Sequence, residues 1–334
     1  MAVSLDAAAI ARQSATLNAL GPHPFGSPRN QAAAQFVAAK LQEAGLAQTT
    51  VEEFAFDGVT GTNVVATVQG RSDRLLIIAT HHDSKKDALD VSARSRSLAL
   101  LIEIGRQAAL LRPAKTWILA SFDGGESAGE GMAHYLESLG RNLGLVDGVM
   151  ILEASSAQTT PNGPALIAPA CPGGPQNRAR SIAGRDLVEA AISGVPASAV
   201  FFFDDPGISL LTQPFIRAFK TDCDPVAARV LASGLGVIQA REVSYSRGFL
   251  AASNAASSDL PASRDTAAAE LGDVAFAAIQ GIDAATPSQP QSDSWLVVGS
   301  RVLPGWLLFV IGIATLVPGL IALRGEKLRL APVS

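Results

Sequence analysis

The sequence is poor in cysteine and aromatic residues and carries little excess charge. Two cysteines among 334 residues exclude both a disulfide framework and a four-cysteine zinc site. Lysine and arginine number 26 against 30 aspartates and glutamates, a formal net charge of -4, so nucleic acid is not an expected partner. Neither a phosphate-binding glycine motif nor a Gly-x-Ser-x-Gly nucleophile elbow is present. These absences argue against a nucleotide-dependent enzyme and a serine hydrolase.

An uncharged apolar segment lies near the end of the chain. Residues 302–323, VLPGWLLFVIGIATLVPGLIAL, would span roughly 33 Å as a helix, which matches a bilayer core. The preceding stretch 286–294, TPSQPQSDS, has the composition of a linker. We therefore expect a globular domain over 1–285, a linker over 286–300, a single-pass transmembrane helix over 301–324 and a short basic tail over 325–334.

The globular part alternates between short apolar runs and stretches of helical periodicity. Helical patterns occupy 30–44, 97–111, 131–139, 225–234 and 266–282. Strand-like runs begin at Thr62 (TNVVATVQG), Arg74 (RLLIIAT), Lys115 (KTWILASF), Gly148 (GVMILE), Ala199 (AVFFF) and Gly236 (GVIQAR). Such alternation is typical of the α/β class. It predicts a three-layer α/β/α domain with a mixed, mostly parallel central sheet.

Polar residues follow several of these strands directly. His81 and Asp83 follow the run RLLIIAT, Glu126 follows the run KTWILASF, and Glu153 ends the run GVMILE. Functional side chains of α/β sheets collect at the carboxyl ends of the strands. A histidine and two carboxylates converging there form a plausible zinc ligand set, with Asp83 placed to orient a histidine. Each residue alone would be an ordinary loop residue.

The order of these motifs resembles the zinc aminopeptidase family of clan MH. That family includes bacterial leucine aminopeptidases, glutaminyl cyclases and endoplasmic reticulum metallopeptidases. The resemblance rests on HHDS, LIEIGR, FDGGE, HY and the acid that ends GVMILE. It extends upstream to GPHPFGSPRNQAAAQFVAAKLQEAGL and downstream to TDCDPVAARVLASGLGVI, and so covers about residues 15–282.

The resemblance implies a site for two zinc ions that share a bridging aspartate, with a glutamate as general base. His81, Glu126 and Glu153 match three of the five ligand positions, and Asp83 matches the partner of the histidine. The remaining positions are changed: Ala93 stands at the bridging acid, Gly125 at the general base and Pro261 at the last histidine. Asp87 or Asp90 could substitute for the bridge only if their loop takes a different course.

Other candidate residues match no role in the family pattern. His82 adjoins the ligand position, His134 suits a structural role in a helix, and His23 between two prolines suits a turn. Cys223 falls where relatives carry a histidine and is more readily a buried thiol than a nucleophile. His81 and His82 lie near Ser84 in the sequence, but this proximity alone does not pair the serine with a histidine as a nucleophile requires.

Glycine has no group that can take a proton, so the resemblance predicts a domain without peptidase activity. We expect either a pseudo-peptidase that serves in binding or as a subunit of a membrane assembly, or a divergent metal-dependent aminopeptidase with replacement ligands. The cofactor would be none or a single weakly bound zinc ion. The expected partners are the membrane and another protein or a peptide.

Two signals conflict over the side of the membrane. Arg324, Lys327 and Arg329 outnumber Arg301 around the apolar segment, which places the large domain outside the cytoplasm by the positive-inside rule. The N-terminal MAVSLDAAAIARQ, however, lacks the basic start and apolar run of an export signal. The domain is therefore either tail-anchored in the cytoplasm or preceded by a missing targeting segment. Membrane-bound members of the family carry this domain on the extracytoplasmic side, so we expect an extracytoplasmic domain.

Overall fold

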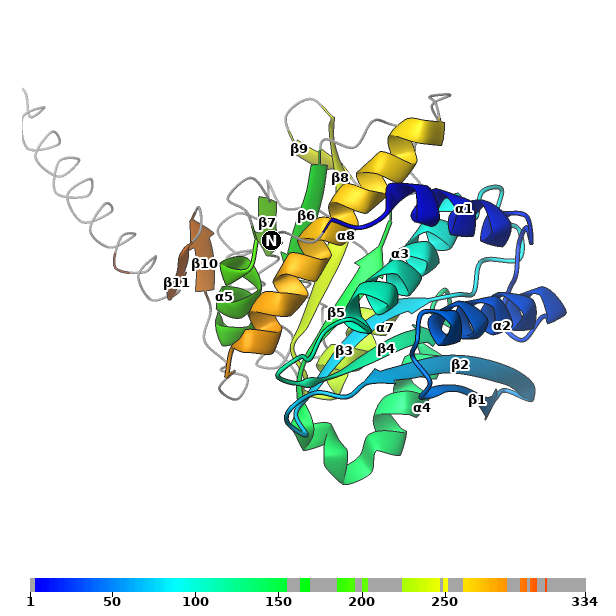
Figure 1. The fold of residues 1–334 in the computed structure, drawn as a ribbon, viewed down its shortest axis with the longest axis horizontal. Coiled ribbons are helices and arrows are strands. Elements are labelled where there is room, and N and C mark those ends of the chain that lie inside the picture. Colours follow the sequence, from blue (N-terminus) through cyan, green and yellow to red (C-terminus); the bar gives the residue numbers. More distant parts are fainter. Residues whose placement is uncertain are drawn as a thin grey trace, which may run out of the picture.

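A central β-sheet lies between two layers of helices (Figure 1). The computed structural model describes residues 4–154, 163–168, 185–195, 200–203, 224–246, 249–251, 261–286, 295–298, 301–304 and 310. Cys171 and Cys223 lie outside this part of the chain, so the expectation for Cys223 concerns a residue that is not described.

The sheet combines a parallel centre with antiparallel flanks. Its strands follow the order β1-β2-β4-β3-β5-β8-β6-β7, and β9 pairs with β8. Neighbouring strands are parallel from β4 through β3 and β5 to β8, and again between β6 and β7; β1-β2, β2-β4, β6-β8 and β8-β9 are antiparallel. The bounds are β1 (Thr49–Phe56), β2 (Val59–Val68), β3 (Leu75–His81), β4 (Thr116–Phe122), β5 (Val146–Glu153), β6 (Gly163–Ala168), β7 (Val200–Phe203), β8 (Val237–Ser246) and β9 (Phe249–Ala251). The predicted α/β class and mixed sheet are confirmed.

The two faces of the sheet are covered by different helices. The larger core joins one face to α1 (Ala7–Asn18), α2 (Pro28–Glu43), α3 (Ser92–Ala108), α5 (Arg185–Ser193) and α8 (Pro261–Ala284). The smaller core joins the other face to α4 (Glu130–Leu139) and α7 (Pro225–Ala232), and the short 3-10 helix η1 (Gly140–Leu145) follows α4. The described residues thus form the expected three layers.

Local sequence explains where the elements begin and turn. Ser27 caps α2 by accepting a hydrogen bond from Asn30 N, and Pro28 occupies the first turn. The β1-β2 hairpin turns at Asp57 and Gly58, both with positive φ, which is the pattern of a two-residue type I′ turn. Strand β4 is buried along its whole length, as expected for a strand covered on both faces.

Helix α8 is tied to the sheet by an indole and a carboxylate. The Trp117 ring on β4 packs edge-on against Phe276, with centroids 6.0 Å apart. Trp117 Nε1 donates to Asp283 Oδ1 at 2.8 Å, and Asp283 also accepts the backbone N–H groups of Ala114 and Lys115. This satisfies the polar edge of a buried aromatic ring and fixes the end of α8 on the sheet.

The segment predicted as linker and start of the membrane helix contains strands instead. Strand β10 (Trp295–Val298) pairs antiparallel with β11 (Arg301–Pro304). The prediction of a helix is therefore wrong for residues 301–304, because valine and leucine side chains on these short runs also suit a hairpin. The rest of the predicted helix, apart from Val310, lies outside the described residues. Within the described part of the chain, no helix is both long enough and apolar enough to cross a bilayer.

Candidate functional site

Strand pairing brings two polar loops together at one edge of the sheet. Strands β3 and β4 are parallel, and His81 stands opposite Phe122 in their register. The loop of residues 82–84 and the loop of residues 123–126 therefore leave the sheet side by side. This is the edge at which α/β folds place functional groups.

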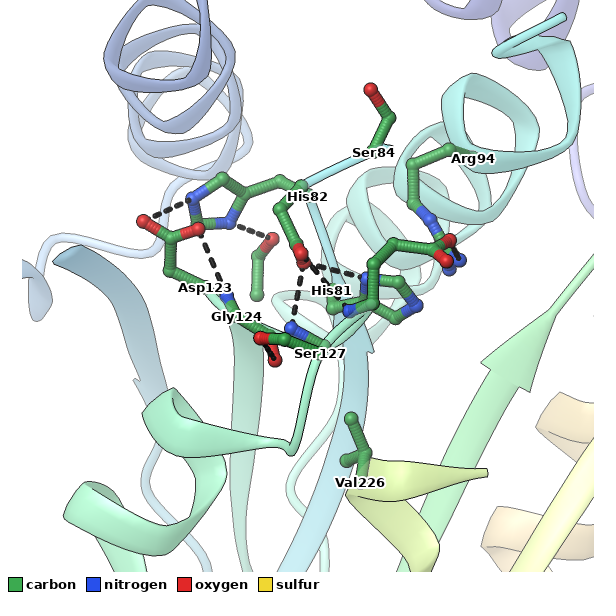
Figure 2. A network of polar contacts seen from close by, with 12 residues as sticks. His81, His82, Ser84, Arg94, Asp123, Gly124, Ser127 and Val226 are labelled. Carbon is green, nitrogen blue, oxygen red and sulfur yellow. Dashed lines mark hydrogen bonds and ion pairs between the residues drawn. The ribbon is translucent and has the colours of Figure 1, made fainter. Parts of the chain in front are cut away.

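His81 and Asp83 form a buried pair at the centre of this edge (Figure 2). His81 Nδ1 lies 2.8 Å from Asp83 Oδ1. Asp83 also accepts the backbone N–H groups of Gly125 at 2.8 Å and Glu126 at 2.9 Å. Burial alone would raise the pKa of Asp83, but the charge and hydrogen bonds of His81 and Glu126 N–H hold it well below its usual range. Since an ionised carboxylate only accepts, His81 donates through Nδ1 and keeps Nε2 for other contacts.

Gly125 packs directly against the His81 ring. A Cβ atom on residue 125 would lie 2.2 Å from His81 Cγ and 2.5 Å from both Cβ and Nδ1 of His81. These distances are far shorter than any van der Waals contact. The position that the resemblance assigns to the general base therefore leaves no room for a side chain.

Glu126 is bound to an arginine from α3. Arg94 Nη2 donates to Glu126 Oε1 at 2.9 Å. Figure 2 shows Arg94 on the His81 side of the loop, while His82 points away toward Asp123. One ligand-type carboxylate of the site is thus already engaged by a fixed positive charge.

Glu153 is also paired with an arginine. It stands opposite Arg241 in the parallel register of β5 and β8, and Arg241 Nε lies 2.9 Å from Glu153 Oε2. Loss of hydration raises the pKa of Glu153, Arg241 opposes that rise, and the nearby Asp224 adds to it. Asp224 itself caps α7 by accepting from Val226 N and Ala227 N.

The residues considered as replacement bridging ligands do not reach this cluster. Asp90 is exposed, and its carboxylate accepts from Ser92 N at 2.8 Å and Ser92 Oγ at 3.0 Å. Asp87 is exposed in the same loop. Ala93 lies in the first turn of α3, and Pro261 begins α8. The structure brings together His81, Asp83 and Glu126 but leaves Asp90 outside.

The neighbouring histidine His82 belongs to a separate buried network. Its Nδ1 lies 2.9 Å from Ser121 Oγ, and burial lowers the pKa of His82 to about 3. Asp123 accepts hydrogen bonds from Asn30 Nδ2 and from the N–H groups of Thr62 and Gly124. Burial and the Asp83 charge raise the pKa of Asp123 to about 6. The neutral His82 ring and the hydrogen-bonded Asp123 carboxyl are both enclosed, so they support the loops rather than contact solvent.

The remaining histidines have structural surroundings. The His134 ring stacks on Phe54 with centroids 5.2 Å apart. His23 is fully buried, its N–H donates to Ser84 Oγ at 2.8 Å, and its carbonyl accepts from Ser84 N. The Ser84 hydroxyl is therefore held by backbone groups in the described structure, which agrees with the weak signal for a serine nucleophile.

The described side chains around this edge of the sheet do not fit a pair of zinc ions. Across the described residues, no three histidine, cysteine, aspartate or glutamate side chains are grouped so as to hold a metal. The two carboxylates Glu126 and Glu153 face arginines, and no acid stands at Ala93. A zinc pair of the family type needs a bridging carboxylate and free ligand oxygens.

Sequence reasoning missed both arginines. Arg94 directly follows Ala93. A positively charged residue next to the position of a missing acidic ligand was therefore the sequence signal that could have identified it. Arg241 ends the strand run GVIQAR just as Glu153 ends GVMILE, and parallel neighbours with matching ends bring such residues together.

The chain has the fold of the zinc aminopeptidases. It superimposes on a zinc aminopeptidase from Bacillus subtilis with a TM-score of 0.62 at 9% identity, covering 86% of this chain and 98% of that one. An aminopeptidase from Aneurinibacillus sp. strain AM-1 gives a TM-score of 0.58 at 12% identity, covering 87% and 97%. A glutaminyl cyclase from Fimbriiglobus ruber gives 0.59 at 15% identity, covering 86% and 97%. No protein-family model matches the sequence, and no curated protein matches it either. The resemblance seen in the motifs is thus confirmed in the fold.

Proposed function

We propose that this chain is a membrane-attached aminopeptidase-like domain that has lost peptidase chemistry and serves in binding another protein or a peptide, as a pseudo-peptidase or a subunit of a membrane assembly. Its cofactor content is none or a single weakly bound zinc ion. The fold supports the peptidase-like origin. The loss of activity and the binding role are inferred from the site.

The observation that carries this proposal is the contact between Gly125 and the His81 ring. General-base catalysis requires a proton acceptor within hydrogen-bond reach of the attacking water. At residue 125 the backbone has no such group, and the His81 ring fills the space that a side chain would need. Losing a general base costs on the order of 10²-fold to 10⁴-fold in rate.

A binding role is supported by the free edge of the described sheet. Strand β1 pairs on one side only, with β2, and both strands of this hairpin expose apolar side chains: Val51, Phe56 and Val59. An edge strand with apolar side chains suits the addition of an extended peptide segment.

The retained His81–Asp83 pair favours the second candidate, a divergent metal-dependent hydrolase. Metal-binding histidines commonly donate their second ring nitrogen to a carboxylate, as His81 does here. One experiment separates the two candidates. The purified full chain is dialysed, its metal content is determined by elemental analysis, and a panel of aminoacyl substrates is assayed with added zinc and with a chelator.

We expect less than one zinc ion per chain and no turnover above the protein-free rate under either condition. A Glu126→Gln variant serves as the matched control. It removes a ligand-type carboxylate, so any true zinc binding or metal-dependent turnover must be lower in this variant. Two zinc equivalents, or turnover that is lost on chelation and in Glu126→Gln, would establish the hydrolase instead.

We further propose a single-pass membrane protein whose large domain is extracytoplasmic. Protease added to intact cells or spheroplasts is then expected to digest the domain and spare a tag on the C-terminal tail. The basic residues after the apolar segment favour this orientation. Full protection of the domain until the membrane is broken would reverse the orientation.

A further inference from the structure

Arg94 is the cation that contacts Glu126, one of the ligand-type residues of the site. It stands in the first turn of α3, and its side chain is only 12% exposed. Its Nη2 donates to Glu126 Oε1 at 2.9 Å, and the Glu126 side chain is 29% exposed. The guanidinium of α3 is thus paired with the ligand-type carboxylate of the loop that follows β4.

A zinc ion and this guanidinium compete for the same carboxylate oxygen. Zinc binds carboxylate oxygens at about 2.0–2.2 Å. Arg94 Nη2 already lies 2.9 Å from Glu126 Oε1, so an ion on this oxygen would meet the arginine at close range. Two like charges at such a distance repel strongly in a partly buried site. Zinc on this oxygen therefore requires that Arg94 leave.

The second ligand-type carboxylate also has an arginine as its ion-pair partner. Arg241 pairs with Glu153 at 2.9 Å from the adjacent strand. Each of the two carboxylates thus has a guanidinium partner supplied by the chain itself. A guanidinium is permanently charged and offers directed donors to carboxylates, which makes it suited to this role.

We propose that Arg94 is a built-in cation that takes the place of a metal ion: it neutralises Glu126, holds the loop of residues 123–126 against α3, and blocks zinc from the site. This inference rests on the proposed loss of peptidase chemistry. It adds that Arg94 takes the position of a bound cation beside Glu126, and that removing the arginine frees Glu126 Oε1 for a single, weakly held zinc ion.

The test compares zinc binding and thermal stability in variants of the full chain in detergent. Zinc chloride is titrated by calorimetry, and the melting temperature is recorded with zinc and with a chelator. Arg94→Ala is expected to melt about 2–5 °C lower in chelator. Zinc should restore this loss, and binding should be at least about ten-fold tighter than in the unmodified chain. The unmodified chain should respond to neither zinc nor chelator.

Two variants serve as controls. Arg106→Ala removes another arginine from α3, one that is paired with Glu103. This variant is expected to show neither zinc binding nor a change in melting temperature with zinc. Arg94→Lys keeps the positive charge and should also show no response to zinc in binding or in melting temperature. It therefore tests the proposal even if Arg94→Ala does not fold. Adding Glu126→Gln to Arg94→Ala should abolish the zinc response.

Zinc bound by the unmodified chain as tightly as by Arg94→Ala, a zinc response in Arg94→Lys equal to that of Arg94→Ala, or no zinc response in a folded Arg94→Ala would each overturn the inference. These outcomes differ from failure of the proposed function. Chelator-resistant turnover of aminoacyl substrates would refute the inactive role and leave the zinc and melting results for Arg94 unchanged.

Discussion

Replacing Asp83 by alanine is expected to lower the free energy of unfolding by about 3–5 kcal/mol. The carboxylate is 1% exposed and accepts three hydrogen bonds, from His81 Nδ1 and the N–H groups of Gly125 and Glu126. Alanine would leave all three donors without this acceptor, two of them in buried hydrogen bonds. Chemical denaturation followed by circular dichroism measures the loss.

The control is Asp87→Ala in the same loop, where the side chain is exposed, so a change within about 0.5 kcal/mol is expected. A loss below about 1 kcal/mol in Asp83→Ala would mean that the two loops do not depend on this carboxylate.

The same contacts set the acid sensitivity of the pair. The folded pKa of Asp83 lies below its ordinary value of 3.8, so its contribution to stability is present above that pH and lost as the pH falls further. The stability difference between the unmodified chain and Asp83→Asn should therefore stay level from neutral pH down to about pH 5 and shrink below about pH 4. His82, which is buried as a neutral ring, also destabilises the fold in acid, but it is shared by both proteins and cancels in the difference.

Gly125→Ala is expected to cost roughly 2–3 kcal/mol of stability, because its new methyl group would overlap the His81 ring. The ring is held through its Nδ1 by Asp83, so it cannot simply turn away. Gly144→Ala is the matched control, since a Cβ there meets nothing within 4 Å, and it should be nearly neutral. Thermal denaturation of both variants measures the difference. Equal stability of the two variants would show that the His81 ring can move away from the new methyl group without loss of stability.

The same crowding decides the outcome of restoring the family's base residue. Gly125→Glu alone should give no robust aminopeptidase turnover, because the new side chain displaces His81, Arg94 stays on Glu126, and no acid stands at Ala93. The assay uses aminoacyl substrates with added zinc. Measurable turnover in this single variant would contradict the view that several features of the site are lost together.

The elements predicted from sequence were those with an unmistakable hydrophobic pattern. The apolar runs of β3, β4 and β5 and the helical periods of α2 and α3 identified the α/β class, since strands buried on both faces are apolar throughout. Strand β1 was missed because its alternating, half-exposed residues give a weak signal, although the Asp57–Gly58 turn beside it marks a hairpin. At the C-terminal end, residues 301–304 were assigned to a helix by their hydropathy, but hydropathy does not distinguish an apolar helix from an apolar hairpin.

The fold class and the strand-end positions of His81, Asp83, Glu126 and Glu153 could be predicted from the chain alone, because hydrophobic periodicity is a local property. The resemblance to the zinc aminopeptidases added that the expected groups are missing at Ala93 and Gly125. The contacts of those ligand-type residues became visible only in the folded chain. Arg94 reaches Glu126 because α3 begins beside the loop after β4, and Arg241 reaches Glu153 because β5 and β8 are parallel neighbours. Such pairings join residues 32 and 88 positions apart, and they depend on how helices and strands pack, which no local pattern encodes.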